Sequence, residues 1–159
     1  MISDKVVTVV PSTIKDALYL SGKLREQDVL EIEANNSTPV ESLTYAIRAS
    51  SAQNFTLKYS GEPVLMGGTV AESIGIARLW MLASDKAYTK PLILGMLSRK
   101  WVNLLHQPYE ILYNYVWKSN NKAIRLLEFL NCSIENEVII KKNLNFVKFI
   151  RCKPEEKRI

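Results

Sequence analysis

The chain has 159 residues and a net charge of +5; 47% of its residues are hydrophobic and 23% are charged, as in an ordinary soluble domain with one core. No apolar run approaches the roughly 18 residues that cross a bilayer, and Pro11 interrupts the N-terminal apolar stretch, unlike a secretory signal. Two cysteines, one histidine and no Cys-x-x-Cys exclude a disulfide framework and give no reason to expect a metal site. We therefore expect a cytosolic protein.

The positive charge is concentrated in the second half of the chain. Residues 1–80 contain 7 basic and 9 acidic residues, a net charge of −2, whereas residues 81–159 contain 14 basic and 7 acidic residues, a net charge of +7. This asymmetry favours an anionic partner. No block of five or six like charges and no recognition motif occurs, so we do not expect nucleic-acid binding.

The first half of the chain predicts a strand, two helices and three more strands. Ser12 or Thr13 can cap a helix that begins at Ile14, and Thr38 with Glu41 has the spacing of a capping box. Periodicity does not decide whether the first helix continues through LREQDVLEIEA or breaks there. The predicted elements are strand Lys5–Val10, helix Ile14–Arg25, helix Pro39–Ser50, and strands Phe55–Tyr59, Val64–Val70 and Ile74–Leu82. The nearly continuous apolar run of the last strand predicts a central position in the sheet.

The second half predicts two helices, each followed by strands. Thr89 is the expected cap of the first helix, and His106 lies near its end, where the helix dipole favours a cation. Asn131 is a suitable left-handed stop for the second helix. The predicted elements are helix Lys90–Leu105, strand Ile111–Trp117, helix Asn120–Leu130, and a closing hairpin of Ser133–Ile140 and Phe146–Cys152.

These elements predict one α/β (α+β) domain over residues 1–152, followed by a polar, mobile tail over residues 153–159. The element order is β-α-α-β-β-β-α-β-α-β-β, around a central mixed, mostly antiparallel sheet. Of the three tryptophans, Trp80, Trp101 and Trp117, we expect two to be buried.

The element order resembles that of the GNAT fold of acetyl-CoA-dependent N-acetyltransferases. In that family a late strand is followed by Asn and a helix with Ala at +3, Leu at +6, Tyr at +7 and a Gly-aromatic pair. Here Asn120 is followed by Ala123 at +3 and Leu126 at +6. The resemblance implies a GNAT-like acyl-CoA N-acyltransferase fold.

A second resemblance is carried by YEILYNYVWKSNNKAIRLLEFLNCSIENEV, residues Tyr109–Val138. This stretch resembles the internal virion protein A family of short-tailed lytic phages, in which an NYVW strand end, a polar turn with Asn and an I-R-x-L helix follow in the same order. The resemblance implies a protein partner from the phage virion or the host, a role in virion assembly, and a location in the host cytoplasm, the virion or both.

Acetyl transfer requires a cradle for the pyrophosphate of coenzyme A, which GNAT enzymes usually form with a Gly-rich loop. The corresponding loop here, Ala83–Pro91, has no glycine, and Pro91 removes one N–H donor from the helix start. Lys86 and Lys90 could hold an anion instead. If a coenzyme A-like ligand binds, the candidate cofactor-binding residues are Leu82, Ser84, Lys86, Lys90 and Asn120.

Acetyl transfer also requires a proton donor for the thiolate, often a Tyr on the last helix. That position holds Leu127, and Asn131-Cys132 replaces the Gly-aromatic pair. Tyr113 and Tyr115 on the preceding strand, which we expect on opposite faces, are alternative donors.

The candidate bases for deprotonating an amine are Glu31, Glu33 and Glu72, all expected to be solvated surface carboxylates. We therefore name no catalytic residue and expect no cofactor. The primary hypothesis is a non-catalytic GNAT-like phage protein that acts by protein contact. The alternative is an N-acetyltransferase that uses acetyl-CoA with an atypical phosphate loop.

Overall fold

The structure is a computed structural model that describes residues 6–50 and 53–154. Its strands are β1 (Val7–Val10), β2 (Asn54–Tyr59), β3 (Glu62–Ser73), β4 (Ile76–Ala83), β5 (Ile111–Trp117), β6 (Ser133–Lys141) and β7 (Leu144–Cys152). Its helices are α1 (Ile14–Ser21), α2 (Glu26–Ala34), α3 (Pro39–Ser50), α4 (Pro91–His106) and α5 (Asn121–Phe129), with a 3-10 helix η2 (Asp85–Thr89). Most of the predicted 153–159 tail lies outside the described residues.

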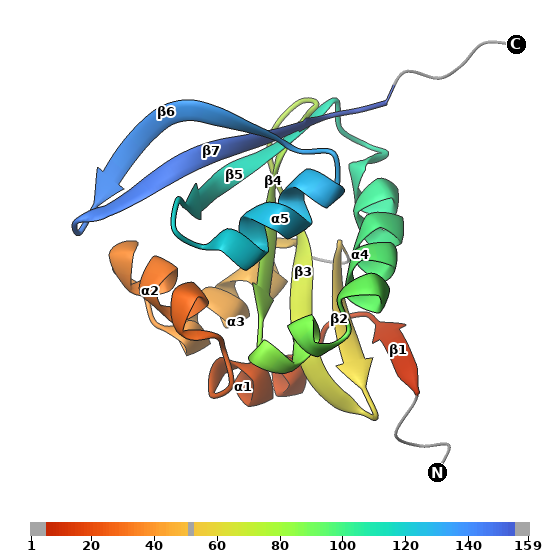
Figure 1. Ribbon diagram of the computed structural model, residues 1–159. Coiled ribbons are helices and arrows are strands. Elements are labelled where there is room, and N and C mark those ends of the chain that lie inside the picture. The colour runs from red at the N-terminus through yellow and green to blue at the C-terminus, as the bar shows by residue number, and fades with distance from the viewer. Residues whose placement is uncertain (1–5, 51–52, 155–159) are drawn as a thin grey trace, which may run out of the picture.

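The seven strands form one sheet in the order β1-β2-β3-β4-β5-β7-β6 (Figure 1). Every neighbouring pair is antiparallel except β4 and β5, which run parallel. The predicted mixed, mostly antiparallel sheet is therefore confirmed, and β4 is its central strand as expected.

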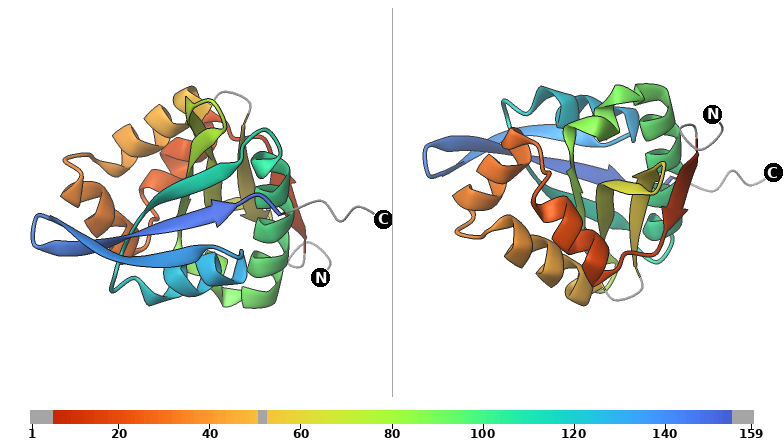
Figure 2. Two further views of the ribbon diagram at one scale, coloured as in Figure 1. Left: turned by 90° about the horizontal axis from the view of Figure 1, so that it is seen from above. Right: turned by 90° about the horizontal axis from the view of Figure 1, so that it is seen from below.

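Helices cover both faces of the sheet, with α1 to α3 on one face and α4 and α5 on the other (Figures 1 and 2). Alternate residues of β4 point to opposite faces. Leu82 packs against the cluster that α1 and α3 bury, whereas Leu79 packs with Leu127 of α5 and Val102 of α4. The central strand is thus buried from both sides.

The segment that follows β1 forms two helices rather than one. Thr13 caps α1 in a capping box with Asp16, and the helix ends at Gly22. The chain then turns onto the sheet, where the Arg25 backbone N–H donates to the Ala83 oxygen at the end of β4 over 2.9 Å. Helix α2 starts from this contact, so a tertiary hydrogen bond decides the break that periodicity left open.

Several local expectations are corrected. Lys90, not Thr89, is the N-cap residue of α4, and the Thr89 hydroxyl donates to the Lys86 oxygen instead. All three tryptophans are partly exposed, so the expectation of two buried ones is wrong. Asn131 does adopt a left-handed conformation after α5, with φ of 65°.

His106 is a buried neutral group rather than a cation at a helix end. Its Nδ1 lies 2.6 Å from an Arg151 guanidinium nitrogen, and its Nε2 lies 3.3 Å from the Glu110 oxygen. Burial, together with the Arg151 charge, lowers the pKa of His106. The Arg151 Nε donates to the Leu130 oxygen at the end of α5. The positive charge of Arg151 therefore lies at the C-terminal end of α5.

Gly68 of β3 permits the close packing of β2, β3 and β4, and its replacement tests this packing. A Cβ at Gly68 would lie 2.5 Å from the Gln53 backbone oxygen. We expect Gly68→Ala to lower the free energy of unfolding by about 2–3 kcal/mol, as overpacking does. Gly22→Ala is the matched control, because the nearest atom, the Tyr19 oxygen, is 3.9 Å away. Urea unfolding of both variants measures the difference; equal stabilities would contradict this packing.

Candidate functional site

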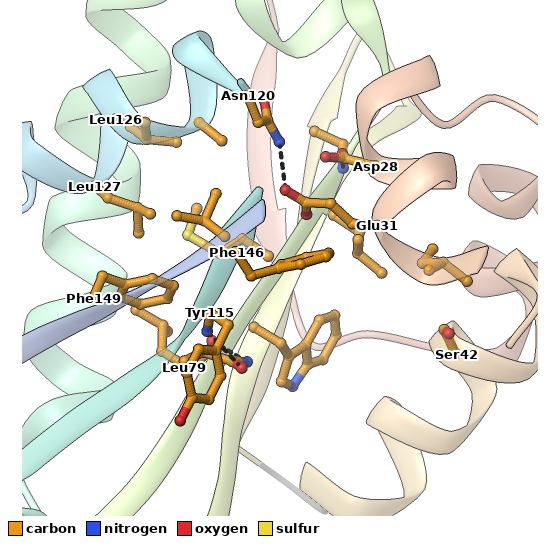
Figure 3. A pocket seen from close by; sticks show the side chains of 18 of the residues that line it. Asp28, Glu31, Ser42, Leu79, Tyr115, Asn120, Leu126, Leu127, Phe146 and Phe149 are labelled. Atoms are coloured by element: carbon orange, nitrogen blue, oxygen red, sulfur yellow. Dashed lines mark hydrogen bonds between the residues drawn. The ribbon is translucent and has the colours of Figure 1, made fainter. Parts of the chain in front are cut away.

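The sheet divides between β4 and β5, and this gap is the candidate site. The two strands pair only from Ile76 with Ile111 to Arg78 with Tyr113, and beyond this point they diverge. A cavity of about 290 Å³ lies in the gap, lined by both strands and by residues of α2, α5 and β7. Figure 3 shows the cavity with Asn120 pointing toward Glu31.

On one side of the gap, α2 packs against the end of β4. An Asp28 carboxylate oxygen accepts a hydrogen bond of 2.9 Å from the Ala83 N–H, and the Ala83 oxygen accepts from the Arg25 N–H. Both backbone groups of Ala83 are therefore taken by the chain itself. Leu24 also forms an isolated antiparallel bridge with Ser84.

Helix α2 also reaches the wall that β5 forms. A Glu31 carboxylate oxygen accepts from the Trp117 N–H at 2.8 Å and from the Asn120 amide at 3.0 Å. Nearer the fork, the Asn114 amide donates to the Leu79 oxygen of β4, which bridges the two strands. Because β4 and β5 separate here, some of their backbone groups have no partner on the neighbouring strand. Side chains of Asp28, Glu31 and Asn114 form hydrogen bonds with these groups instead.

One arginine links these groups. Arg25 is only 2% exposed, and its guanidinium donates to the Asn120 side-chain oxygen at 3.0 Å and to Asp28 at 3.3 Å. It also lies 4.6 Å from the centre of the Tyr88 ring. We call Arg25, Asp28, Glu31 and Asn120 the gap network. It contains two carboxyl groups and one guanidinium.

The gap network binds protons more readily than exposed carboxylates do. Burial raises the pKa of Asp28 to about 6, even though the Ala83 N–H and Arg25 act in the opposite direction. Burial likewise raises the pKa of Glu31 to about 7, against the hydrogen bonds from Asn120 and Trp117. Glu31 is therefore not the solvated carboxylate expected from the sequence, whereas Glu33 is exposed.

The five candidate cofactor-binding residues do not converge on one site. Leu82 and Asn120 line the cavity, but Asn120 is fully buried and already bonded within the gap network. The Ser84 N–H donates to Val64 of β3, on the side away from β5. Lys86 forms a 2.6 Å ion pair with Glu62, and Lys90 lies 5.9 Å from the Tyr59 ring centre. Ser84, Lys86 and Lys90 do not line the cavity.

The candidate proton donors are also dispersed. Leu127, which stands where GNAT enzymes often carry the donor Tyr, is buried in the core and lines the cavity. Tyr113 and Tyr115 lie on the same face of β5 with ring centres 6.3 Å apart, so the expectation of opposite faces is wrong: side chains two residues apart share a face. Tyr115 lines the cavity, whereas the Tyr113 hydroxyl donates to the exposed Glu72 outside it.

Sequence reasoning missed the roles of Arg25 and Asp28 and misjudged Glu31. Their spacing of three residues places them near one another along a helix, which was the available signal. The partners of these side chains lie 55 to 95 residues away in the sequence, and no local pattern points to them.

Solved structures share this fold. Similar structures are Ard1 from Thermoplasma volcanium (TM-score 0.70, 16% identity, 94% of this chain and 99% of that one), the ribosomal-protein-S18-alanine N-acetyltransferase from Escherichia coli (0.69, 16%, 96% and 97%) and the aminoglycoside acetyltransferase AAC(6′)-Ib in complex with coenzyme A (0.65, 18%, 93% and 95%). No family model and no curated protein matches the chain. A GNAT-family acetyltransferase from Streptococcus pneumoniae is also similar (TM-score 0.64, 15% identity, 94% of this chain and 100% of that one), and these matches show a GNAT acyltransferase fold.

The two raised pKa values predict that stability falls as pH rises. Because the folded chain holds these protons more tightly than the unfolded chain does, the stabilisation is complete below the ordinary value of 4.5 for Glu31 and is lost through about 7. The free energy of unfolding of the wild-type protein falls as pH rises. We expect Glu31→Gln, which keeps both accepted hydrogen bonds, to reduce this fall by about 2–3 kcal/mol. Unfolding at about pH 5 and about pH 8 measures this. Glu33→Gln on the same helix is the control. If stability depends on pH identically in both variants, the prediction for Glu31 is contradicted.

Proposed function

We propose that this chain is a non-catalytic protein of the GNAT fold that acts by contact with a protein partner. The observation that carries the proposal is the gap network, which places α2 carboxylates on backbone donors of both β4 and β5. An extended ligand that entered the gap would have to displace them.

Coenzyme A is poorly matched to such a gap. Its pantetheine arm carries amide groups that need backbone partners along a strand edge, and both groups of Ala83 are already bonded. Desolvated amides without partners cost free energy. The loop that would hold the pyrophosphate is the glycine-free 3-10 helix η2, and Lys86 is turned to Glu62. Leu127 has no proton to give to a thiolate.

The phage setting is proposed from the sequence resemblance of Tyr109–Val138 alone, since no family model matches the chain. The partner is then a virion or host protein, and the chain works in the host cytoplasm, in the particle or in both. If the chain is phage-encoded, mass spectrometry of purified virions distinguishes a packaged protein from one that stays in the host.

A second candidate function is N-acetyl transfer from acetyl-CoA. The cavity of about 290 Å³ between β4 and β5 favours it, as does the coenzyme A complex of the similar AAC(6′)-Ib structure. In this alternative, α2 moves away from β4 to admit the thioester. Glu31, with a pKa of about 7, is then a proton acceptor at the cavity wall.

Calorimetry with acetyl-CoA separates the two functions. At about 1 mM acetyl-CoA we expect no heat of binding and no change in melting temperature, because the backbone groups of Ala83 are already bonded. A ligand that did bind would raise the stability, by about 2.7 kcal/mol at 100 times its Kd. Asp28→Ala, which frees the Ala83 N–H, is the informative variant. The acetyltransferase function would replace our proposal if the wild-type protein binds acetyl-CoA, the Asp28→Ala variant binds it more tightly, and the double variant Lys86→Ala, Lys90→Ala binds it more weakly.

A further inference from the structure

The outer face of α4 and α5 exposes large apolar side chains. Leu92 is 80% exposed, Met96 is 68% exposed and Phe129 is 43% exposed. Leu92 and Met96 are four residues apart on α4 and are therefore neighbours on its surface. The Phe129 ring lies against Gly95, since a Cβ there would be 2.8 Å from the ring. The three side chains thus form one continuous patch, which we call the α4–α5 face.

Phe129 is held in place on this surface. The Arg99 guanidinium stacks 3.8 Å from the ring centre and donates to the Phe129 backbone oxygen at 2.6 Å. The glycine that accommodates the ring sits inside a helix, where it costs about 1 kcal/mol relative to alanine. The chain therefore accepts a local cost and still leaves much of the aromatic ring in water.

Basic side chains surround the apolar patch. Lys100 follows Met96 by four residues and Arg125 precedes Phe129 by four residues, so both lie beside the patch. With Arg99 they make three basic residues beside the patch, against one acidic residue of α5, Glu128. The α4–α5 face combines protruding apolar groups with a positive rim.

The shape and charge of the α4–α5 face indicate what kind of partner it fits. Side chains that are 80% and 68% exposed protrude and cannot be the walls of a groove, which argues against a docked peptide helix. A second copy would bring two positive rims together. An anionic lipid surface accepts both features at once, since its headgroups attract basic residues and its acyl boundary admits protruding apolar side chains.

We propose that the α4–α5 face binds the surface of an anionic lipid bilayer peripherally. Leu92, Met96 and Phe129 enter the headgroup boundary, and Arg99, Lys100 and Arg125 contact the anionic headgroups. No helix in the described part of the chain has the length and apolar character needed to cross a bilayer.

Vesicle co-sedimentation tests this contact. We expect binding to phosphatidylcholine vesicles that contain phosphatidylglycerol and none to phosphatidylcholine alone, with loss in high salt because screening weakens the headgroup attraction. Leu92→Ser with Met96→Ser should weaken binding roughly tenfold or more, as should Lys100→Glu with Arg125→Glu. Leu18→Ser, at a residue 55% exposed on α1 across the sheet, is the control and should bind as the wild type does.

Melting temperatures of these surface variants, measured in parallel, show that each is folded. Binding that is equal for the two lipid compositions, or unchanged in both double variants, would overturn the proposal. So would a wild-type dimer, seen by light scattering, that the Leu92→Ser and Met96→Ser changes dissociate, because the face would then belong to a second copy.

Discussion

The hydrogen bonds from backbone N–H groups to the α2 carboxylates are the constraint on which the functional region depends. A sheet that divides between two parallel strands leaves strand-edge donors and acceptors facing a gap, and such groups cannot stay buried without partners. In this chain Asp28 closes the β4 side and Glu31 closes the β5 side. These contacts hold α2 against both strands of the gap.

Closure by carboxylates has an electrostatic consequence. Two buried acids share a single buried guanidinium, so ionisation of both leaves an uncompensated negative charge in a region of low dielectric constant. The hydrogen bonds from Ala83, Asn120 and Trp117 favour the ionised forms, but burial outweighs them. The network therefore stabilises the gap most when it carries protons, and this couples the packing of α2 to pH.

The sequence predicted what local signals encode. Short apolar and β-branched runs predicted the strands, Ser12 or Thr13 predicted the start of α1, and Asn131 predicted the end of α5, because each depends on residues close in the chain. It did not predict the gap network, whose members meet only when α2, β4 and the β5–α5 turn pack together. Glu31 and Glu33 illustrate the difference: they lie on one short helix, yet only the fold makes one a buried hydrogen-bond acceptor and leaves the other in water.

Fold and function separate at this gap. The similar acetyltransferase structures share the sheet and helices at 16–18% identity, so the architecture tolerates almost complete replacement of its residues. What fills the space between β4 and β5 is not fixed by that architecture, because either a ligand or the protein's own side chains can satisfy the strand edges. Here α2 carboxylates accept hydrogen bonds from both strands and a cavity of about 290 Å³ remains between them, while Lys86 of η2 is paired with Glu62.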